Sequence, residues 1–398
     1  MPPESIEDVR PARRHETMAL MKIQGSWGKH LRPALLAAVL ALFFYTSVVS
    51  GQTLQDLPPP PPPPKPKPKP TPTPPPAPKD EDFDVIRTTS NLVMVPVSVV
   101  DAAGQPVLGL PKTDFRLEEQ GREQQITELG NPDQVPLDIV LLFDISSSVS
   151  QKGFFEFQQK AAASFLRQVM KPTDRAAVFT IGENPQLVSP FAPTDIAAAK
   201  LQTIPAATTP VPTAFYDAVS AAAKYLVEQS ADRHRRVILV ISDGDDNFSN
   251  LIREMTVAEV RASQRGDATP ASAKRSLDAR RDRAVLDVQK AVQQADAAFY
   301  SVNPGGKSVY LNMISTRAQN AMRSIAESTG GTAFIPDSEA DLERVFGEVA
   351  AELRGQYLLQ YYSDSKTPSR DFRSIKVSVP TRPETRVRAR QGYYPKQK

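Results

Sequence analysis

Residues Leu137 to Ser148 read LDIVLLFDISSS and carry the strongest structural signal of the chain. The apolar run is too short to span a membrane, and its Ile, Val and Leu content is typical of a strand buried on both faces in a parallel sheet. The strand ends in the pattern Asp-x-Ser-x-Ser, formed by Asp144, Ser146 and Ser148. Open α/β sheets bind ligands at the carboxyl ends of their strands. Oxygen-bearing side chains at this place suit a hard divalent cation such as Mg²⁺.

Two further stretches are placed to complete such a site. Val237 to Gly244 reads VILVISDG, which predicts a second buried strand that also ends in a carboxylate, Asp243. Thr213 begins the helical pattern TAFYDAVSAAAKYLVEQ. Its hydroxyl is therefore expected at the start of a helix, where it can approach the two strand ends.

This set of side chains resembles the metal-ion-dependent adhesion site of the von Willebrand factor type A (VWA) family. The resemblance covers about residues 136 to 353 and includes the segments FDxSxS, TAxYDA and SDGDDN in the family's order. It implies a divalent cation, Mg²⁺ or else Mn²⁺ or Ca²⁺, with Asp144 and Asp243 acting partly through water. The implied metal ligands are Asp144, Ser146, Ser148, Thr213 and Asp243.

One departure from the family concerns the approach to Thr213. The family usually has a glycine shortly before this threonine, whereas this chain has Pro210-Val211-Pro212. Two prolines fix φ, so a stiffer loop is expected here.

Helix capping is the alternative interpretation of the carboxylates, because Asp and Ser are favoured at helix starts. It explains Asp144 or Asp243 alone, but not carboxylates and hydroxyls that end two buried strands together. The nearby polar residues are interpreted as hydrogen-bonding groups of the loop and helix rather than as metal ligands: Asp217, Asp245, Asp246 and Asn247.

Strand and helix patterns alternate regularly between residues 136 and 353, which predicts a doubly wound, mostly parallel α/β sheet. Leu187 to Phe191 is expected as a short edge strand, because Pro190 is tolerated only there. Between Asp246 and Ala295 the chain is longer than a crossover needs. Helices over 257–264 and 273–295 are predicted in this insertion, which lies near the site in sequence and is read as a solvated surface.

The segments on either side of this unit alternate apolar and polar residues in short runs, which predicts antiparallel strands. Neither residues 85–135 nor residues 354–398 can bury a core alone. We therefore expect them to form one small β domain into which the VWA domain, residues 136–353, is inserted. Because of Pro96, the first strand, Leu92 to Val100, is expected to lie at the edge of a sheet or to contain a bulge. With the stretch Arg388 to Tyr394, the arrangement resembles the VWA-related proteins of acidobacterial secretomes.

The N-terminal part of the chain reads as an export signal followed by a spacer. Residues 1–51 contain a basic segment, a short apolar core and small residues, the pattern of a signal peptide or N-terminal anchor. Residues 52–84 are a Pro-rich linker without a packed core, and the stretch 58–78 would extend about 60 Å as polyproline II. We expect an exported protein in the periplasm, the envelope or the medium, with a possible membrane tether through the leader.

Composition excludes several function classes. The 398 residues suffice for two or three domains, and a formal net charge of +3 gives no electrostatic reason to expect nucleic-acid binding. The chain has no cysteine, which excludes disulfides and thiolate metal sites, and only three histidines.

These observations favour a non-enzymatic, protein-binding adhesion module. The bound cation would keep an open position for an Asp or Glu of a partner protein. Two alternatives stay open: a metal-assisted hydrolase, which would need a positioned base, and a scaffold in which the metal is purely structural.

Overall fold

The computed structural model describes residues 92–146, 155–305, 313–338, 341–364 and 371–395. Internal contacts divide the chain into Met1–Asp84 and Val85–Lys398, and all described residues belong to the second unit. The expected signal peptide or anchor of residues 1–51 and the linker of residues 52–84 lie outside the described residues. Ser148 lies outside them as well.

A six-stranded sheet lies at the centre of the second unit, with the strand order β10-β9-β8-β5-β6-β7. Its strands are β5 (Leu137–Asp144), β6 (Arg175–Ile181), β7 (Gln186–Ala192), β8 (Arg235–Ile241), β9 (Ala297–Val302) and β10 (Ala333–Phe334). All neighbours are parallel except β6 and β7. β7 contains Pro190 and is an antiparallel edge strand, as expected. The predicted mostly parallel α/β fold is confirmed.

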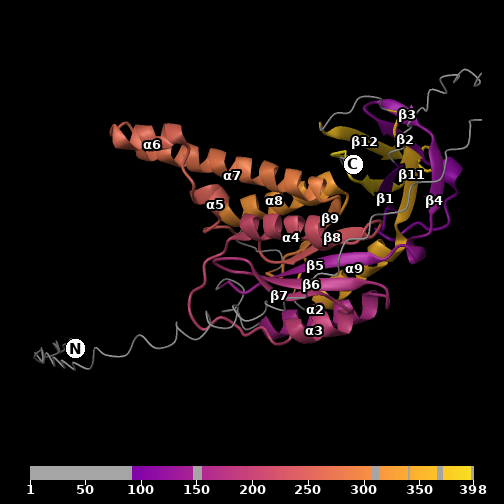
Figure 1. Ribbon diagram of the computed structural model, residues 1–398, viewed down its shortest axis with the longest axis horizontal. Helices are drawn as coiled ribbons and strands as arrows, with labels where there is room; N and C mark the ends of the chain where they lie inside the picture. The colour runs from indigo at the N-terminus through magenta and orange to yellow at the C-terminus, as the bar shows by residue number, and fades with distance from the viewer. Residues whose placement is uncertain (1–91, 147–154, 306–312, 339–340, 365–370, 396–398) are drawn as a thin grey trace, which may run out of the picture. The chain divides into compact units, whose positions relative to one another are not determined.

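Helices cover both faces of this sheet because its strands present apolar residues to each side (Figure 1). In β5, Ile139, Leu141 and Phe143 belong to one apolar core, and Val140 and Leu142 to the other. The first core is completed by α2 (Phe155–Val169), α3 (Thr194–Leu201) and α9 (Leu342–Gly355). The second is completed by α4 (Phe215–Gln229), α7 (Pro270–Gln294) and α8 (Met313–Thr329).

Two antiparallel sheets enclose a third core and combine both flanks of the chain, as expected. Their strand orders are β13-β1-β11-β4 and β14-β12-β2-β3. The strands are β1 (Leu92–Val100), β2 (Arg116–Glu119), β3 (Arg122–Gln124), β4 (Ile126–Gly130), β11 (Tyr357–Tyr362), β12 (Arg373–Ser378), β13 (Arg386–Ala389) and β14 (Gly392–Tyr393). β1 pairs with β11 and β13, and β2 pairs with β12. The domain bounds 85–135, 136–353 and 354–398 stay predictions.

β1 differs from the expectation of an edge strand, because it has a neighbour on each side. It pairs with β11 from Leu92 to Val97, but with β13 only from Val97 to Val100. Pro96 therefore lies where only one side of β1 faces a partner among the described strands. This is the local equivalent of an edge, where a missing N–H group is tolerated.

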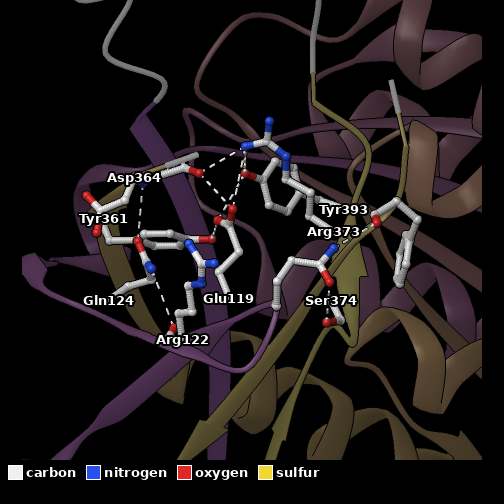
Figure 2. A network of polar contacts seen from close by, with 11 residues as sticks. Glu119, Arg122, Gln124, Tyr361, Asp364, Arg373, Ser374 and Tyr393 are labelled. Atoms are coloured by element: carbon white, nitrogen blue, oxygen red, sulfur yellow. Dashed lines mark hydrogen bonds and ion pairs between the residues drawn. The ribbon is translucent and has the colours of Figure 1, made fainter. Parts of the chain in front are cut away.

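A buried polar network around Glu119 joins the two sheets of the β domain (Figure 2). Glu119 Oε2 accepts hydrogen bonds from the hydroxyls of Tyr361, at 2.6 Å, and Tyr393, at 3.2 Å. Its Oε1 accepts one from Ser363 Oγ at 2.7 Å and lies 3.5 Å from the guanidinium of Arg373. Glu119 belongs to the first flank and its four partners to the second, so the network ties the two halves together.

The β domain also contacts the α/β unit through arginines. Arg235, at the start of β8, donates to Gln356 Oε1 at 3.2 Å and to the carbonyl oxygen of Pro132 at 3.3 Å. Arg388 of β13 donates to Glu352 of α9 at 2.7 Å. Because β8 begins at Arg235, these contacts lie near the edge of the sheet where the strands begin.

Three helices form the insertion between β8 and β9: α5 (Asn250–Arg253), α6 (Val257–Gln264) and α7. α6 has the predicted bounds, but α7 begins at Pro270 rather than at residue 273. The reason is a capping box, in which Thr269 Oγ1 accepts the Ser272 N–H at 3.1 Å, and proline suits the first helical position. α6 and the first turns of α7 extend beyond the sheet on the side where α5 lies (Figure 1).

Candidate metal site at the carboxyl ends of the strands

Asp144 and Asp243 lie close together at one edge of the central sheet. Asp144 is the last residue of β5, and Asp243 follows the end of β8. The two strands are parallel neighbours in which Phe143 is level with Ile241. Burial raises the pKa of Asp144, and the charge of Asp243 raises it further, as expected for two neighbouring carboxylates.

The carboxyl group of Asp144 is buried and oriented by hydrogen bonds. Asp144 is only 1% exposed to solvent. Oδ1 accepts the Ser146 N–H at 2.7 Å, and Oδ2 accepts the Ser242 hydroxyl at 2.5 Å. Burial and the charge of Asp243 raise the pKa of Asp144 to about 7, although hydrogen bonds from Ser242 and Ser146 oppose the rise. Asp144 is therefore held in one orientation, but burial and the neighbouring charge disfavour its ionised form.

Ser242 is a site residue that the sequence analysis missed. It is fully buried, and its hydroxyl donates to Asp144 and accepts the Gly244 N–H at 2.9 Å. Gly244 has a φ of +77°, in the left-handed region that favours glycine. Ser242 thus connects the β5 carboxylate to the turn after β8. The only sequence signal for it is a hydroxyl residue directly before Asp243.

Thr213 is held by its backbone against the loop that follows Asp243. Its N–H donates to Asn247 Oδ1 at 2.9 Å. Its carbonyl oxygen accepts the N–H groups of Asn247, at 3.1 Å, and Phe248, at 3.0 Å. Thr213 is buried, and it is placed beside the loop of Asp243 directly after the proline-containing segment.

The same loop caps α4. The N-cap residue of α4 is Ala214, which has no side-chain acceptor. Instead, Asp246 Oδ2 accepts the Tyr216 N–H at 2.8 Å, and Ser249 Oγ accepts the Asp217 N–H at 3.0 Å. Burial raises the pKa of Asp246. The start of α4 and the loop of Asp243 are therefore one hydrogen-bonded structure, which agrees with the structural roles expected for Asp217, Asp246 and Asn247.

A second buried aspartate of β5, Asp138, shows the opposite electrostatic situation at the other edge of the sheet. The Arg175 guanidinium donates to both of its oxygens, at 2.9 and 2.7 Å. The Ser230 hydroxyl donates at 2.7 Å, and His234 Nδ1 lies 3.1 Å away. Burial alone would raise the pKa of Asp138, but these hydrogen bonds lower it. β5 thus has a carboxylate with a cationic partner where it begins and one beside another carboxylate where it ends.

Four of the five predicted ligands can be located. Asp144, Ser146 and Asp243 are brought together, and Thr213 lies on the adjoining loop. Ser148 lies outside the described residues. Within the described part of the chain, no three His, Cys, Asp or Glu side chains form a group that could hold a metal ion. Metal binding by the five residues therefore stays a prediction.

The chemistry of these residues nevertheless fits a hard divalent cation. Carboxylate and hydroxyl oxygens are ligands that Mg²⁺, Mn²⁺ and Ca²⁺ accept. Two carboxylates beside each other, one of them with its pKa raised to about 7, form a place where added positive charge is favourable.

The fold and this site define a class: α/β proteins with helices on both faces of the sheet and oxygen-bearing side chains at the carboxyl ends of its strands. Residues 139–245 match the sequence model of the von Willebrand factor type A domain. The chain therefore contains a VWA domain, as its motifs predict. Comparison with curated proteins found no match.

Several solved structures are similar to the chain. A von Willebrand factor type A protein from Catenulispora acidiphila has 12% identity and a TM-score of 0.41, with 78% of this chain and 64% of that chain covered. An aerotolerance-related membrane protein from Bacteroides fragilis has 16% identity and a TM-score of 0.37, with coverages of 55% and 98%. The vWF domain of the type V pili tip protein Mfa5 from Porphyromonas gingivalis has 14% identity and a TM-score of 0.39, with coverages of 54% and 94%.

Proposed function

We propose that the chain is an exported or envelope-tethered protein-binding module. Its VWA domain binds a divalent cation, Mg²⁺ or else Mn²⁺ or Ca²⁺, and a partner protein contributes an Asp or Glu to that cation. The observation that carries the proposal is the pair of carboxylates, Asp144 and Asp243, at the ends of two adjacent buried strands. VWA domains mediate protein–protein interactions, which supports the same function.

Each site residue has a distinct role in this proposal. Asp144, Ser146, Ser148, Thr213 and Asp243 would hold the cation, and the cation would supply an open coordination position for a carboxylate. Ser242 keeps Asp144 in its orientation through the 2.5 Å hydrogen bond.

Coupling to α4 follows from the hydrogen bonds of the loop. Asp246 and Ser249 bond to backbone N–H groups of the first turn of α4. If partner binding displaces the Asp243 loop, α4 should therefore move with it. The equilibrium between the free and displaced positions of α4 would shift only by the difference in the partner's affinity for them.

A non-enzymatic role is part of the proposal. A hydrolase would need a base positioned beside the metal. The candidate bases near the site are Asp217, Glu183 and Asp245, and Asp217 already accepts the Asn250 N–H at 2.8 Å. Turnover of phosphoesters or peptides by the purified protein, abolished in Asp243→Ala, would instead establish the hydrolase.

Export rests on the N-terminal sequence. The basic and apolar pattern of residues 1–51 supports a cleaved signal or an anchor, and the Pro-rich residues 52–84 support a spacer that holds the folded unit away from a membrane. Among the described residues, no helix has the length and apolar character needed to cross a membrane. The intact mass of the exported protein would distinguish the cleaved from the anchored form.

Crosslinked affinity capture from intact cells, with and without chelator, tests the proposed function. We expect one set of proteins to be captured in Mg²⁺, and to be lost in EDTA and with Asp144→Ala. Glu118→Ala, a change on β2 of the β domain, should capture the same proteins as the wild type. Capture that persists in EDTA would contradict the proposal. Loss of stability in EDTA with capture unchanged would instead indicate a structural metal.

A further inference from the structure

Residues 254–283 form a helical arm that contributes no fully buried side chain to the core. The arm consists of α6, the turn after it and the first half of α7. α6 contributes no buried residue. The buried residues of α7 are Ala284, Val288 and Val292, all beyond the arm. The arm extends beyond the sheet on the side of α5 (Figure 1).

Polar contacts, together with Leu277 packed against the second core, hold the arm in place. Arg280 Nε donates to the carbonyl oxygen of Ile252 in α5 at 2.7 Å, and its guanidinium pairs with Glu259 of α6. Glu259 also accepts the Thr256 N–H at 2.6 Å in the capping box of α6. Since an eight-residue helix is marginal on its own, these contacts account for its presence.

The anchor of the arm is continuous with the candidate metal site. α5 begins directly after Ser249, which caps α4. The Asn250 N–H donates to Asp217 Oδ2, in the first turn of α4, at 2.8 Å. Arg280 then bonds to the last turn of α5. The arm is therefore joined by consecutive contacts to the loop that begins at Asp243.

Apolar side chains of the arm are exposed to solvent. Met255 is 49% exposed, Val257 66% and Val260 39%. Val257 and Val260 are three residues apart and share one face of α6. Single exposed apolar residues are ordinary, but three within six positions of a segment that buries none indicate a surface for another protein.

The arm also has an excess of exposed positive charge. The arm has seven basic and five acidic residues, of which Glu254 and Asp282 are exposed. The other three acidic residues pair with arginines: Glu259 with Arg280, Asp267 with Arg265, and Asp278 with Arg317. Exposed basic residues of the arm that have no ion pair within the described part of the chain are Arg261, Lys274, Arg275 and Arg283. This surface is complementary to an acidic protein segment.

We propose that the arm is the second contact surface for the partner of the metal site. It fits an acidic segment of that partner in which an apolar side chain packs on Val257 and Val260 while acidic neighbours face Lys274 and Arg275. The inference rests on the proposed function, because the metal site supplies the first contact. Both surfaces favour the same chemistry: a carboxylate for the cation and carboxylates for the basic residues of the arm.

Selection of random phage-displayed peptides against the full chain in Mg²⁺ provides the probe. We expect the selected peptides to be rich in Asp and Glu around one aliphatic or aromatic residue. Their affinity should fall about tenfold or more for Val257→Ser/Val260→Ser and for Lys274→Glu/Arg275→Glu. The charge reversal should also flatten the dependence of affinity on salt, since rim charges act through screened attraction.

A matched control comes from α3, on the other face of the sheet. Ile196 and Lys200 are exposed there, and Ile196→Ser/Lys200→Glu should bind the peptides as the wild type does. All variants should take up Mg²⁺ like the wild type in calorimetry. Unchanged peptide affinity in both arm variants, or selected peptides without acidic enrichment, would overturn the inference. So would arm variants that lose Mg²⁺ uptake, because the arm would then support the site structurally. Failure of the proposed function would appear separately, as peptide binding that persists in EDTA and in Asp243→Ala.

Discussion

Two aspartates of one strand show how their surroundings determine the behaviour of a buried carboxylate. Asp138 has Arg175 beside it, whereas Asp144 has Asp243. Hydrogen bonds lower the pKa of the first, and burial with a like charge raises that of the second. Asp138 therefore stabilises the fold as an anion, and Asp144 is a carboxylate that a cation would stabilise.

The raised pKa of Asp144 predicts a pH dependence of the metal-free protein. The group is protonated in the folded state up to about pH 7 but ionises near pH 3.8 when unfolded. Its contribution to the free energy of unfolding is therefore fully present below pH 3.8 and is lost as the pH rises through about 7. Relative to Asp144→Asn, which cannot ionise, the wild type in EDTA should lose about 4 kcal/mol across this range. Urea unfolding at several pH values measures it.

Mg²⁺ should remove this loss, because metal binding requires the deprotonated carboxylate and releases its proton. A difference between wild type and Asp144→Asn that stays constant with pH in EDTA would show that folding does not raise the pKa of Asp144. The repulsion inferred between Asp144 and Asp243 would then be absent.

The site could be predicted from the sequence only where a motif marks it. Asp144, Ser146 and Asp243 end recognisable apolar runs, and the structure brings them together. Ser242 was missed as a site residue, and for Asp246 a hydrogen-bonding role was predicted without its partner, because both roles depend on partners elsewhere in the chain. Ser242 contacts β5 and Asp246 contacts α4, and no local pattern encodes such contacts.

At the level of elements, α4 depends on a cap from another segment. The loop after β8 supplies Asp246 and Ser249 where Ala214 has no capping group. We expect Ser249→Ala to lower the free energy of unfolding by about 1 kcal/mol, the usual cost of losing an N-cap. Ser220→Ala in the middle of the same helix should change it by less than about 0.5 kcal/mol. Thermal or urea unfolding of the two variants tests this, and equal effects would show that the cap contributes nothing.

The success of sequence prediction also varied among the elements for physical reasons. β5 and β8 were predicted because continuous apolar runs indicate strands with helices on both faces. The predicted edge position of β1 was wrong. The sequence does not show that β13 pairs with β1 only from Val97 to Val100, which leaves Pro96 outside that pairing. The start of α7 was placed three residues late, because the Thr269–Pro270 cap was interpreted as a loop.

At the scale of the whole molecule, the Glu119 network adds to the strand pairing that joins the two flanks of the β domain (Figure 2). Glu119→Ala would leave Arg373 buried without its carboxylate, together with the hydroxyls of Tyr361 and Tyr393. We expect a loss of about 3 kcal/mol in the free energy of unfolding, the scale for removing one partner of a buried ion pair.

The neighbouring Glu118 provides the control for this prediction. Its side chain lies 3.3 Å from Arg116, which is about half exposed. Glu118→Ala should therefore cost about 1 kcal/mol or less. Urea unfolding of both variants measures the difference, and similar losses would mean that the Glu119 network does not hold the two flanks together.

The arrangement of the whole unit leaves the two edges of the central sheet with different tasks. The contacts of Arg235 to the β domain lie near the edge where β8 begins. The carboxylates of Asp144 and Asp243 lie at the opposite edge, where β5 and β8 end. The β domain can therefore support the sheet without occupying the candidate metal site.

Calorimetric titration of the full chain with Mg²⁺ tests the central claim most directly. We predict saturable binding of one ion per chain for the wild type and for Glu118→Ala, and no binding for Asp144→Asn or Asp243→Ala. Equal uptake by the wild type and Asp144→Asn, or no uptake by the folded wild type, would contradict a metal site at the carboxyl ends of β5 and β8.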